Sequence, residues 1–250
     1  MIELWRYGLA AGAALAAGTA NAIAGGGSLI TFPALMAIGL PAVAANVTNT
    51  VALCPGYVGA VVTQRRDLAG QGRRAALVLP AAAVGGVVGA LALLWTGESV
   101  FRTIVPYLIL FAAAALALQD RLRRWLMSRH GGGHSEVWVI APVALVAVYG
   151  GYFGAGFGVM LLAATAIVFG DSLIRLNALK QATSLTVNVP AALVFALSGQ
   201  VDWALATVMF AAALAGGAIG GAIASRIPAA VLKWTIVVAS GIVAILYLVK

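Results

Sequence analysis

Ten apolar runs, separated by short polar connections, set the strongest limit on how this chain of 250 residues can fold. They cover residues 4–24, 28–40, 42–64, 75–95, 100–118, 137–153, 159–170, 176–197, 203–225 and 229–249. Most of them are about 19–23 residues long, enough for a helix to cross the hydrocarbon core of a bilayer. Because lipid offers no partner to free backbone N–H and C=O groups, we predict that these segments are α-helices.

Composition supports a membrane protein. Hydrophobic residues make up 63% of the chain and charged residues only 9%, whereas soluble domains carry about 25% charged residues. The net charge of +8 comes mainly from arginines in two polar connections: Arg65, Arg66, Arg73 and Arg74 in one, and Arg121, Arg123, Arg124 and Arg129 in the other. Such clusters are typical of cytoplasmic loops. We therefore expect a multi-pass inner-membrane (plasma-membrane) protein with the lipid bilayer as its partner, and no nucleic acid.

The two halves of the sequence repeat one pattern at a constant difference in residue number (156 − 25 = 131), which we call the repeat offset. The matched pairs are Gly25 with Gly156, Gly27 with Gly158, Gly39 with Gly170, Asn46 with Asn177, Gly85 with Gly216, Gly86 with Gly217, Gly89 with Gly220, and Arg102 with Lys233. A single offset that carries glycines, an asparagine and a basic residue indicates a duplication. We predict an all-α polytopic membrane protein with two homologous repeats, 1–118 and 137–250, joined by a basic cytoplasmic linker, 119–136.

The number of crossings depends on how residues 4–40 and their counterparts are threaded. If they cross the membrane once, each half has four crossings and the halves are parallel. If they cross twice, each half has five and the halves are inverted. Both alternatives place the two arginine clusters on the cytoplasmic side, and we expect about eight crossings.

The strongest functional signal is Lys180, which lies inside an apolar run, where a charge costs at least about 2.5 kcal/mol. The polar residues Asn177, Gln181, Ser184 and Asn188 recur around it at the spacing of one helix face. The first half carries Asn46, Thr48, Asn49 and Thr50 at the matching place, with Asn49 opposite Lys180. Amides alone could simply join helices, but a lysine needs a counter-charge or water. We predict an anion site shared by the halves, with snorkelling of Lys180 to the interface as the alternative.

Glycine-rich breaks provide the second signal. Gly25, Gly26, Gly27 and Ser28 precede one short apolar run, and Gly154, Gly156 and Gly158 precede its counterpart. Glycine lets backbone approach a ligand closely, and a helix that starts there directs free N–H groups at an anion. Short, glycine-interrupted helices in matching positions are typical of transporters. Close helix packing at a kink is the alternative reading.

Other glycines lie four residues apart inside the apolar runs, at Gly85 and Gly89 and at Gly216 and Gly220. This spacing predicts helix packing rather than a site.

The chain lacks the signals of several other chemistries. Its acids all lie in or beside predicted loops, so no intramembrane proton relay is visible, and Asp171 with Arg175 predicts a helix-end salt bridge. Cys54 is the only cysteine, and His130 and His134 flank a glycine linker. We expect no enzyme, no cofactor and no metal site.

Two groups of residues resemble the sulfite exporter TauE/SafE family. The first is Ala24-Gly25-Gly26-Gly27-Ser28-Leu29-Ile30 with Pro33 and Leu35, then Gly39-Leu40-Pro41 and Asn46-Val47-Thr48-Asn49. The second is Gly154-Ala155-Gly156-Phe157-Gly158 with Asn177-Ala178-Leu179-Lys180. The resemblance covers nearly the whole chain and implies transport of a small sulfur oxyanion or organosulfonate, such as sulfite, thiosulfate or sulfoacetate. Ser28 departs from the small or apolar residue often found there, which leaves the specificity open.

We therefore expect a transporter of a small sulfur-containing anion, with export preferred because an inside-negative potential supplies about 2.3 kcal/mol per charge per 100 mV. The predicted substrate-binding residues are Gly25, Gly26, Gly27, Ser28, Asn46, Thr48, Asn49, Thr50, Gly156, Gly158, Asn177, Lys180, Gln181 and Ser184. A channel or carrier for another small ion, an intramembrane enzyme and a non-transporting assembly subunit are the rivals. The sequence leaves a homo-oligomer open.

Overall fold

A computed structural model describes residues 4–23, 26–128, 135–223 and 229–249. Within these ranges the chain is helical and contains no strand. The helices are α1 (Leu4–Ile23), α2 (Ser28–Ala37), α3 (Ala42–Thr63), α4 (Arg65–Leu68), α5 (Gly72–Ser128), η1 (Glu136–Val139), α6 (Ile140–Tyr152), α7 (Phe157–Phe169), α8 (Leu173–Leu197), α9 (Trp203–Ile223) and α10 (Ala229–Val249). The predicted all-α class is confirmed.

The long helix α5 consists of two helices. Gly97 has a left-handed φ of 69° and divides it into segments 72–96 and 98–128. Its last turns cover residues 119–128, so the first part of the expected linker is helical. Because no glycine or proline occurs between Gln119 and Ser128, nothing in this stretch ends the helix.

Helix starts in the two halves follow the offset found in the sequence. α3 and α8 begin at Ala42 and Leu173, and α5 and α9 begin at Gly72 and Trp203, so both pairs reproduce the repeat offset (173 − 42 = 131 and 203 − 72 = 131). The short helices α2 and α7 both follow a glycine break, as predicted. Gly26 and Gly156 have φ values of 87° and 74° there, a conformation that glycine adopts without strain.

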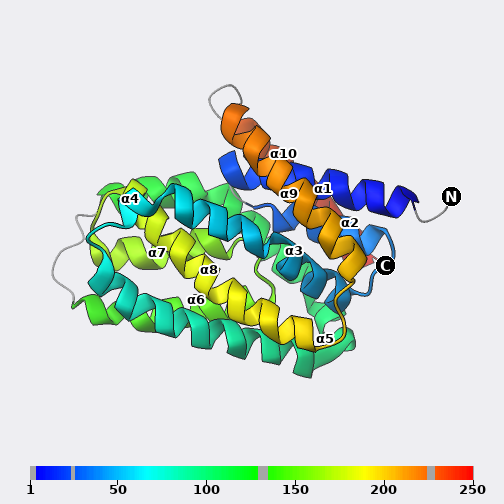
Figure 1. Ribbon diagram of the computed structural model, residues 1–250, viewed down its shortest axis with the longest axis horizontal. Coiled ribbons are helices and arrows are strands. Elements are labelled where there is room, and N and C mark those ends of the chain that lie inside the picture. Colours follow the sequence, from blue (N-terminus) through cyan, green and yellow to red (C-terminus); the bar gives the residue numbers. More distant parts are fainter. Residues whose placement is uncertain (1–3, 24–25, 129–134, 224–228, 250) are drawn as a thin grey trace.

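Bonds between distant segments show how the chain runs between its two ends. Arg74 contacts both Glu136 and Asp171, so η1, α6 and α7 leave one end of the molecule and return to it. We call this the loop end and define it as residues 64–74, 136 and 169–177; it lies at the left of Figure 1, and the two termini lie at the right. At the opposite end, Glu98 accepts bonds from the amides of Ala42 and Val43 at 2.7 and 2.8 Å.

This threading differs from the expectation of about eight crossings, in which residues 137–170 pass through once. The reason is the length of the helices: α7 has 13 residues and α2 has 10, whereas a crossing needs about 20. By length and composition, one described stretch, Gly72–Leu122, can cross a membrane, and Gly97 divides it. Other apolar helices are shorter, among them Trp203–Ile219 and Lys233–Leu248.

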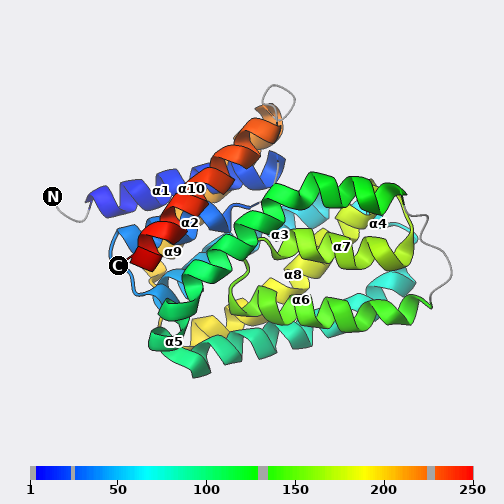
Figure 2. The ribbon, with the colours of Figure 1, turned by 180° about the vertical axis from the view of Figure 1, so that it is seen from behind.

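The halves are interlocked, because the first helix of each packs against the other half. α1 packs against α9, and α6 packs against α5, as the lower part of Figure 2 shows. A Cβ added to Gly216 would lie 2.0 Å from the backbone oxygen of Leu15, and one added to Gly89 would lie 2.1 Å from that of Val148. The packing role predicted for these glycines is confirmed.

Apolar side chains cover the outside of the bundle. Leu197, Trp95 and Leu145 are 90%, 87% and 74% exposed. The interior in turn holds polar side chains, such as those of Asn49 and Ser184, at 2% and 1% exposure. Helices that face acyl chains show this distribution.

Candidate functional site

Lys180 lies half-buried on α8, beside the start of α7. A Cβ added to Gly158 would meet the Lys180 Cδ at 3.8 Å, so the lysine stem runs past the glycine break. Among the described residues, no carboxylate lies within ion-pair distance of the Lys180 amine. A cation inside an apolar helix without a protein partner favours an anionic ligand.

The glycine break gives this ammonium group a second feature that suits an anion. Gly156 is the left-handed N-cap of α7, and a Cβ there would meet the backbone of Ala112 at 3.1 Å. Gly158 follows in the first turn, where helical N–H groups lack intrahelical partners. The predicted residues Gly156, Gly158 and Lys180 are therefore brought together.

The matching place in the first half is filled by protein groups. The amide of Gly27 donates to Asn21 Oδ1 at 2.8 Å, and Thr31 Oγ1 donates to Asn49 Oδ1. Asn49 corresponds to Lys180, since 180 − 49 = 131. Asn49 and Gly27 thus have internal partners.

Of the remaining candidate residues of α3, two bond to neighbouring segments and one bonds within the helix. Asn46 Nδ2 donates to the Tyr152 carbonyl at 2.9 Å at the end of α6, and its buried Oδ1 has no partner among the described residues. Thr48 Oγ1 accepts from the Asp202 amide at 3.0 Å. Thr50 Oγ1 donates to the Asn46 carbonyl at 2.9 Å.

Along α8, Asn177 Nδ2 donates to Gln64 Oε1 at 2.9 Å. Gln181 is half-buried and Ser184 is buried. Gln64, which follows the last residue of α3, bonds near the start of α8, whereas Thr48 bonds to Asp202 beyond the end of α8. The two helices therefore run antiparallel. No hydrogen bond between described residues joins the set 46–50 to the set 177–184, and the two sets lie toward opposite ends of the helix pair.

The first glycine break is only partly described. Gly26 packs against Leu116, whose Cδ2 would lie 2.9 Å from an added Cβ. Ser28 begins α2 and is half-buried. Gly25 lies outside the described residues, as do His130 and His134.

Sequence reasoning missed the roles of Asn21, Thr31 and Glu98. Asn21 and Thr31 complete the first half, and both were visible as polar residues within apolar runs. Glu98 was placed beside a loop, but its carboxylate caps the N-terminus of α3 from across the fold, where the helix dipole favours negative charge.

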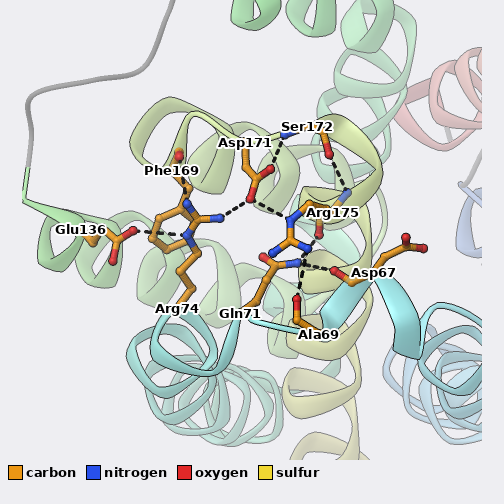
Figure 3. A network of polar contacts seen from close by, with 9 residues as sticks. All are labelled: Asp67, Ala69, Gln71, Arg74, Glu136, Phe169, Asp171, Ser172 and Arg175. Carbon is orange, nitrogen blue, oxygen red and sulfur yellow. Dashed lines mark hydrogen bonds and ion pairs between the residues drawn. The ribbon is translucent and has the colours of Figure 1, made fainter.

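The loop end carries the densest set of charges among the described residues (Figure 3). Asp171 bonds to both Arg74 and Arg175, the latter at 3.0 Å, so the predicted salt bridge is confirmed. Burial raises the pKa of Asp171, but bonds from the Ser172 amide and the two guanidinium groups outweigh it and hold this pKa below its ordinary value.

A groove of about 540 Å³ lies elsewhere, between α5 and α6. Residues such as Pro80, Val84 and Ala144 line it, and it contains none of the candidate polar residues. Its apolar walls suit acyl chains and do not suit an anion.

An apolar exterior, polar groups inside and short helices at glycine breaks define this chain as a membrane transporter. It belongs to the sulfite exporter TauE/SafE family, whose model matches residues 10–247.

Its relatives carry names that describe transport and not catalysis. It is 31% identical to the probable membrane transporter protein YfcA of Escherichia coli (strain K12), covering 83% of this chain and 76% of the relative. It is 29% identical to a probable membrane transporter protein of Haemophilus influenzae, over 80% and 78% of the two chains. A probable membrane transporter protein, ORF9, of Sinorhizobium sp is 28% identical, over 91% and 87%. No solved structure matches the chain.

Proposed function

We propose that this protein is a multi-pass inner-membrane transporter of a small sulfur-containing anion, and that its two repeats are inverted. We infer inversion from the threading and the helix lengths: if residues 137–170 enter and return at one end, and α8, α9 and α10, with 25, 21 and 21 residues, each cross once, that half has three crossings. An odd number reverses the direction of the next copy. The basic loop end faces the cytoplasm in this proposal.

Lys180 supplies the charge of the substrate site. Gly156 and Gly158 bring backbone N–H groups to the same place, and Gln181 and Ser184 add hydrogen bonds from the same helix. The single observation that carries the proposal is a half-buried ammonium group beside a glycine break, without a carboxylate partner among the described residues. The family's description as a sulfite exporter supports a sulfur oxyanion.

Export agrees with the charge of the substrate. An inside-negative potential drives an anion outward by about 2.3 kcal/mol per charge per 100 mV, so no proton relay is needed for that direction. In this proposal the remaining predicted residues of α3, with Gly26, Gly27 and Ser28, are structural and lie outside the substrate path, because Asn49 and Gly27 already have internal partners.

The test is flux of radiolabelled sulfite in proteoliposomes. Lys180→Ala removes the only charge assigned to the site, so flux per folded molecule should fall by at least about 100-fold, equivalent to about 2.7 kcal/mol. Lys233→Met is the matched control, because Lys233 also lies in an apolar helix but is paired with Asp120. It should keep flux per folded molecule. Undiminished flux in Lys180→Ala would overturn the assignment.

A binding measurement identifies the substrate independently of any transport assay. Sulfite, thiosulfate, sulfate and methanesulfonate are each added to the purified protein, and the melting temperature is followed. A ligand at about 100 times its dissociation constant stabilises the protein by about 2.7 kcal/mol. The shift should disappear in Lys180→Ala and persist in Lys233→Met.

A further inference from the structure

The loop end holds an internal anion between two arginines. The Asp171 carboxylate lies between the guanidinium groups of Arg74, at the start of α5, and Arg175, in the first turn of α8 (Figure 3). The side chains of Arg74 and Asp171 are about one-fifth exposed and that of Arg175 about one-third. Planar guanidinium groups bind oxyanions through paired hydrogen bonds.

These residues also join the two halves across the loop end. Gln71 Nε2 donates to the Arg175 carbonyl at 2.9 Å, and Arg175 donates to the Ala69 carbonyl at 3.1 Å. The Arg74 guanidinium lies 5.0 Å from the ring centre of Phe169 and bonds to Glu136 at 3.2 Å.

The cluster stands close to the proposed substrate site. Arg175 and Lys180 are five residues apart on α8, which places them about 7.5 Å apart along the helix axis. Asn177, bonded to Gln64, lies between them. Because each residue turns the helix by about 100°, the two side chains leave α8 about 140° apart, and the arginines lie nearer to the loop end than Lys180 does.

The charged cluster has no counterpart at the matching positions of the other half, so it is not part of the packing that both halves share. At the repeat offset, Arg74 corresponds to Leu205 and Asp171 corresponds to Leu40, and both leucines are buried. The bonded arrangement is thus found at the loop end and has no counterpart at the matching positions 40 and 205. It buries the Gln71 Oε1 acceptor without a partner among the described residues, and separation of the segments would let water bond to that oxygen.

We propose that Arg74 and Arg175 form an access site for an oxyanion, which Asp171 occupies when the loop end is closed. An incoming oxyanion takes the place of the Asp171 carboxylate on the two guanidinium groups. The bonds between segments 64–74 and 169–177 then break, and Lys180 becomes accessible from the loop end. The identity of the anion rests on the function proposed above. The closure of the loop end by Asp171 does not depend on which anion is transported.

The test measures access to the interior from the loop end. Ser184→Cys, in a Cys54→Ser background, places a thiol at a site that is 1% exposed. Vesicles that expose the loop end are treated with a membrane-impermeant anionic maleimide. Asp171→Asn should raise the labelling rate by at least about 10-fold, because its neutral amide no longer holds two guanidinium groups.

Asp67→Asn is the matched control. It removes the same charge from the same end, but the Asp67 carboxylate points away from the arginines in Figure 3, and its labelling should stay at the parent rate. Asp171→Glu, which keeps a carboxylate, should remain slower than Asp171→Asn. Equal rates for Asp171→Asn and Asp67→Asn would overturn the proposal. If Asp171→Asn does not accumulate, Arg175→Gln carries the same expectation.

A second arm tests replacement by an oxyanion. Methanesulfonate, which is inert toward maleimides, should speed labelling of the protein with Asp171 intact, whereas chloride at equal ionic strength should not. Arg175→Gln should show no further acceleration by methanesulfonate, because its loop end is already open and one of the two guanidinium groups is gone. Equal effects of the two anions would overturn displacement. The Asp171→Asn result should persist with Lys180→Ala, so failure of the substrate site and failure of the access site are told apart.

Discussion

The helix pairs α2–α3 and α7–α8 share a glycine break, a short helix and a polar long helix, yet among the positions at which they differ is one pair that forms a hydrogen bond in the first and not in the second. In the first pair Thr31 bonds to Asn49. At the repeat offset the second pair has Leu162 and Lys180. Leu162 stands where the first pair has Thr31, so it offers no hydrogen-bond donor, and the Lys180 ammonium group stands where the first pair has the Asn49 amide.

In the function proposed above, this difference separates a structural helix pair, α2–α3, from the substrate-binding pair, α7–α8. The first pair closes on itself, because Asn21 occupies the space beside Gly27 and Thr31 occupies the acceptor of Asn49. In the second pair the Lys180 amine has no carboxylate partner among the described residues, and the Lys180 Cδ lies 3.8 Å from a Cβ added to Gly158. A duplicated unit can keep its packing in both copies and specialise in one.

Transplanting the first pair into the second should have the largest effect. Leu162→Thr with Lys180→Asn recreates the Thr31–Asn49 bond in α7–α8, so the protein should fold. It should also lose sulfite flux by at least about 100-fold, since about 2.7 kcal/mol of binding to the substrate charge is gone.

Leu162→Thr alone is the control and should transport. Proteoliposome flux and the melting temperature, measured on the same samples, check both statements. A double variant that transports normally would show that the comparison between the pairs has no functional meaning.

Alanine substitutions at the glycines where helices of the two halves approach closely test the packing that both halves have in common. Gly216→Ala places a Cβ 2.0 Å from the Leu15 oxygen, and Gly85→Ala places one 2.6 Å from the Ala147 Cβ. Overpacking of this kind costs about 1–3 kcal/mol or more, so both should melt at lower temperature. Gly217→Ala, whose Cβ would have no atom within 4 Å, should be neutral. Normal melting of both crossing variants would contradict the packing.

Thr31→Val probes the closed pair. It leaves the buried Asn49 oxygen without a donor, which costs about 1–3 kcal/mol, while flux per folded molecule should stay within about twofold. The double variant Thr31→Val with Asn49→Leu should regain part of the lost stability, because both partners are then apolar. Thermal melting in detergent checks this. Loss of flux in Thr31→Val at unchanged stability would place the first pair in the substrate path.

The smallest effect concerns pH. Hydrogen bonds hold the pKa of Asp171 below its ordinary value, so its bonds contribute stability above the ordinary value of about 3.9 and are lost as the pH falls through the folded-state pKa. Labelling of the Ser184→Cys protein should therefore be constant between about pH 6 and about pH 8 after correction for maleimide reactivity. A rise within that window would contradict the charged state of Asp171.

The sequence was sufficient for the helical class, the short helices at the glycine breaks and the family. Apolar runs and glycines report directly on which segments can be helices in lipid. It was not sufficient for the threading, because the position of Glu136 and Asp171 beside Arg74 is a contact between distant segments. The same limit hid Glu98, whose role depends on a helix that begins 56 residues earlier.

The partners of candidate residues were equally hidden. Lys180 was visible as a charge in an apolar run, and its lack of a carboxylate partner could be argued from the positions of the acids. That Asn46 and Asn177 bond to Tyr152 and Gln64 depends on helix register, which periodicity leaves undetermined.

The pairing of α1 with α9 constrains how the protein is made. α1 ends at Ile23 and α9 begins at Trp203, so most of the chain is synthesised between the two helices. At about 5–20 residues per second, α1 waits roughly 10 to 40 s in the bilayer for its partner. During biogenesis the face of α1 around Leu15, which Gly216 of α9 later contacts, is open to other helices or to an insertion factor. A ribosome that stalls before Trp203 leaves a chain in which α1 has no α9 to pack against.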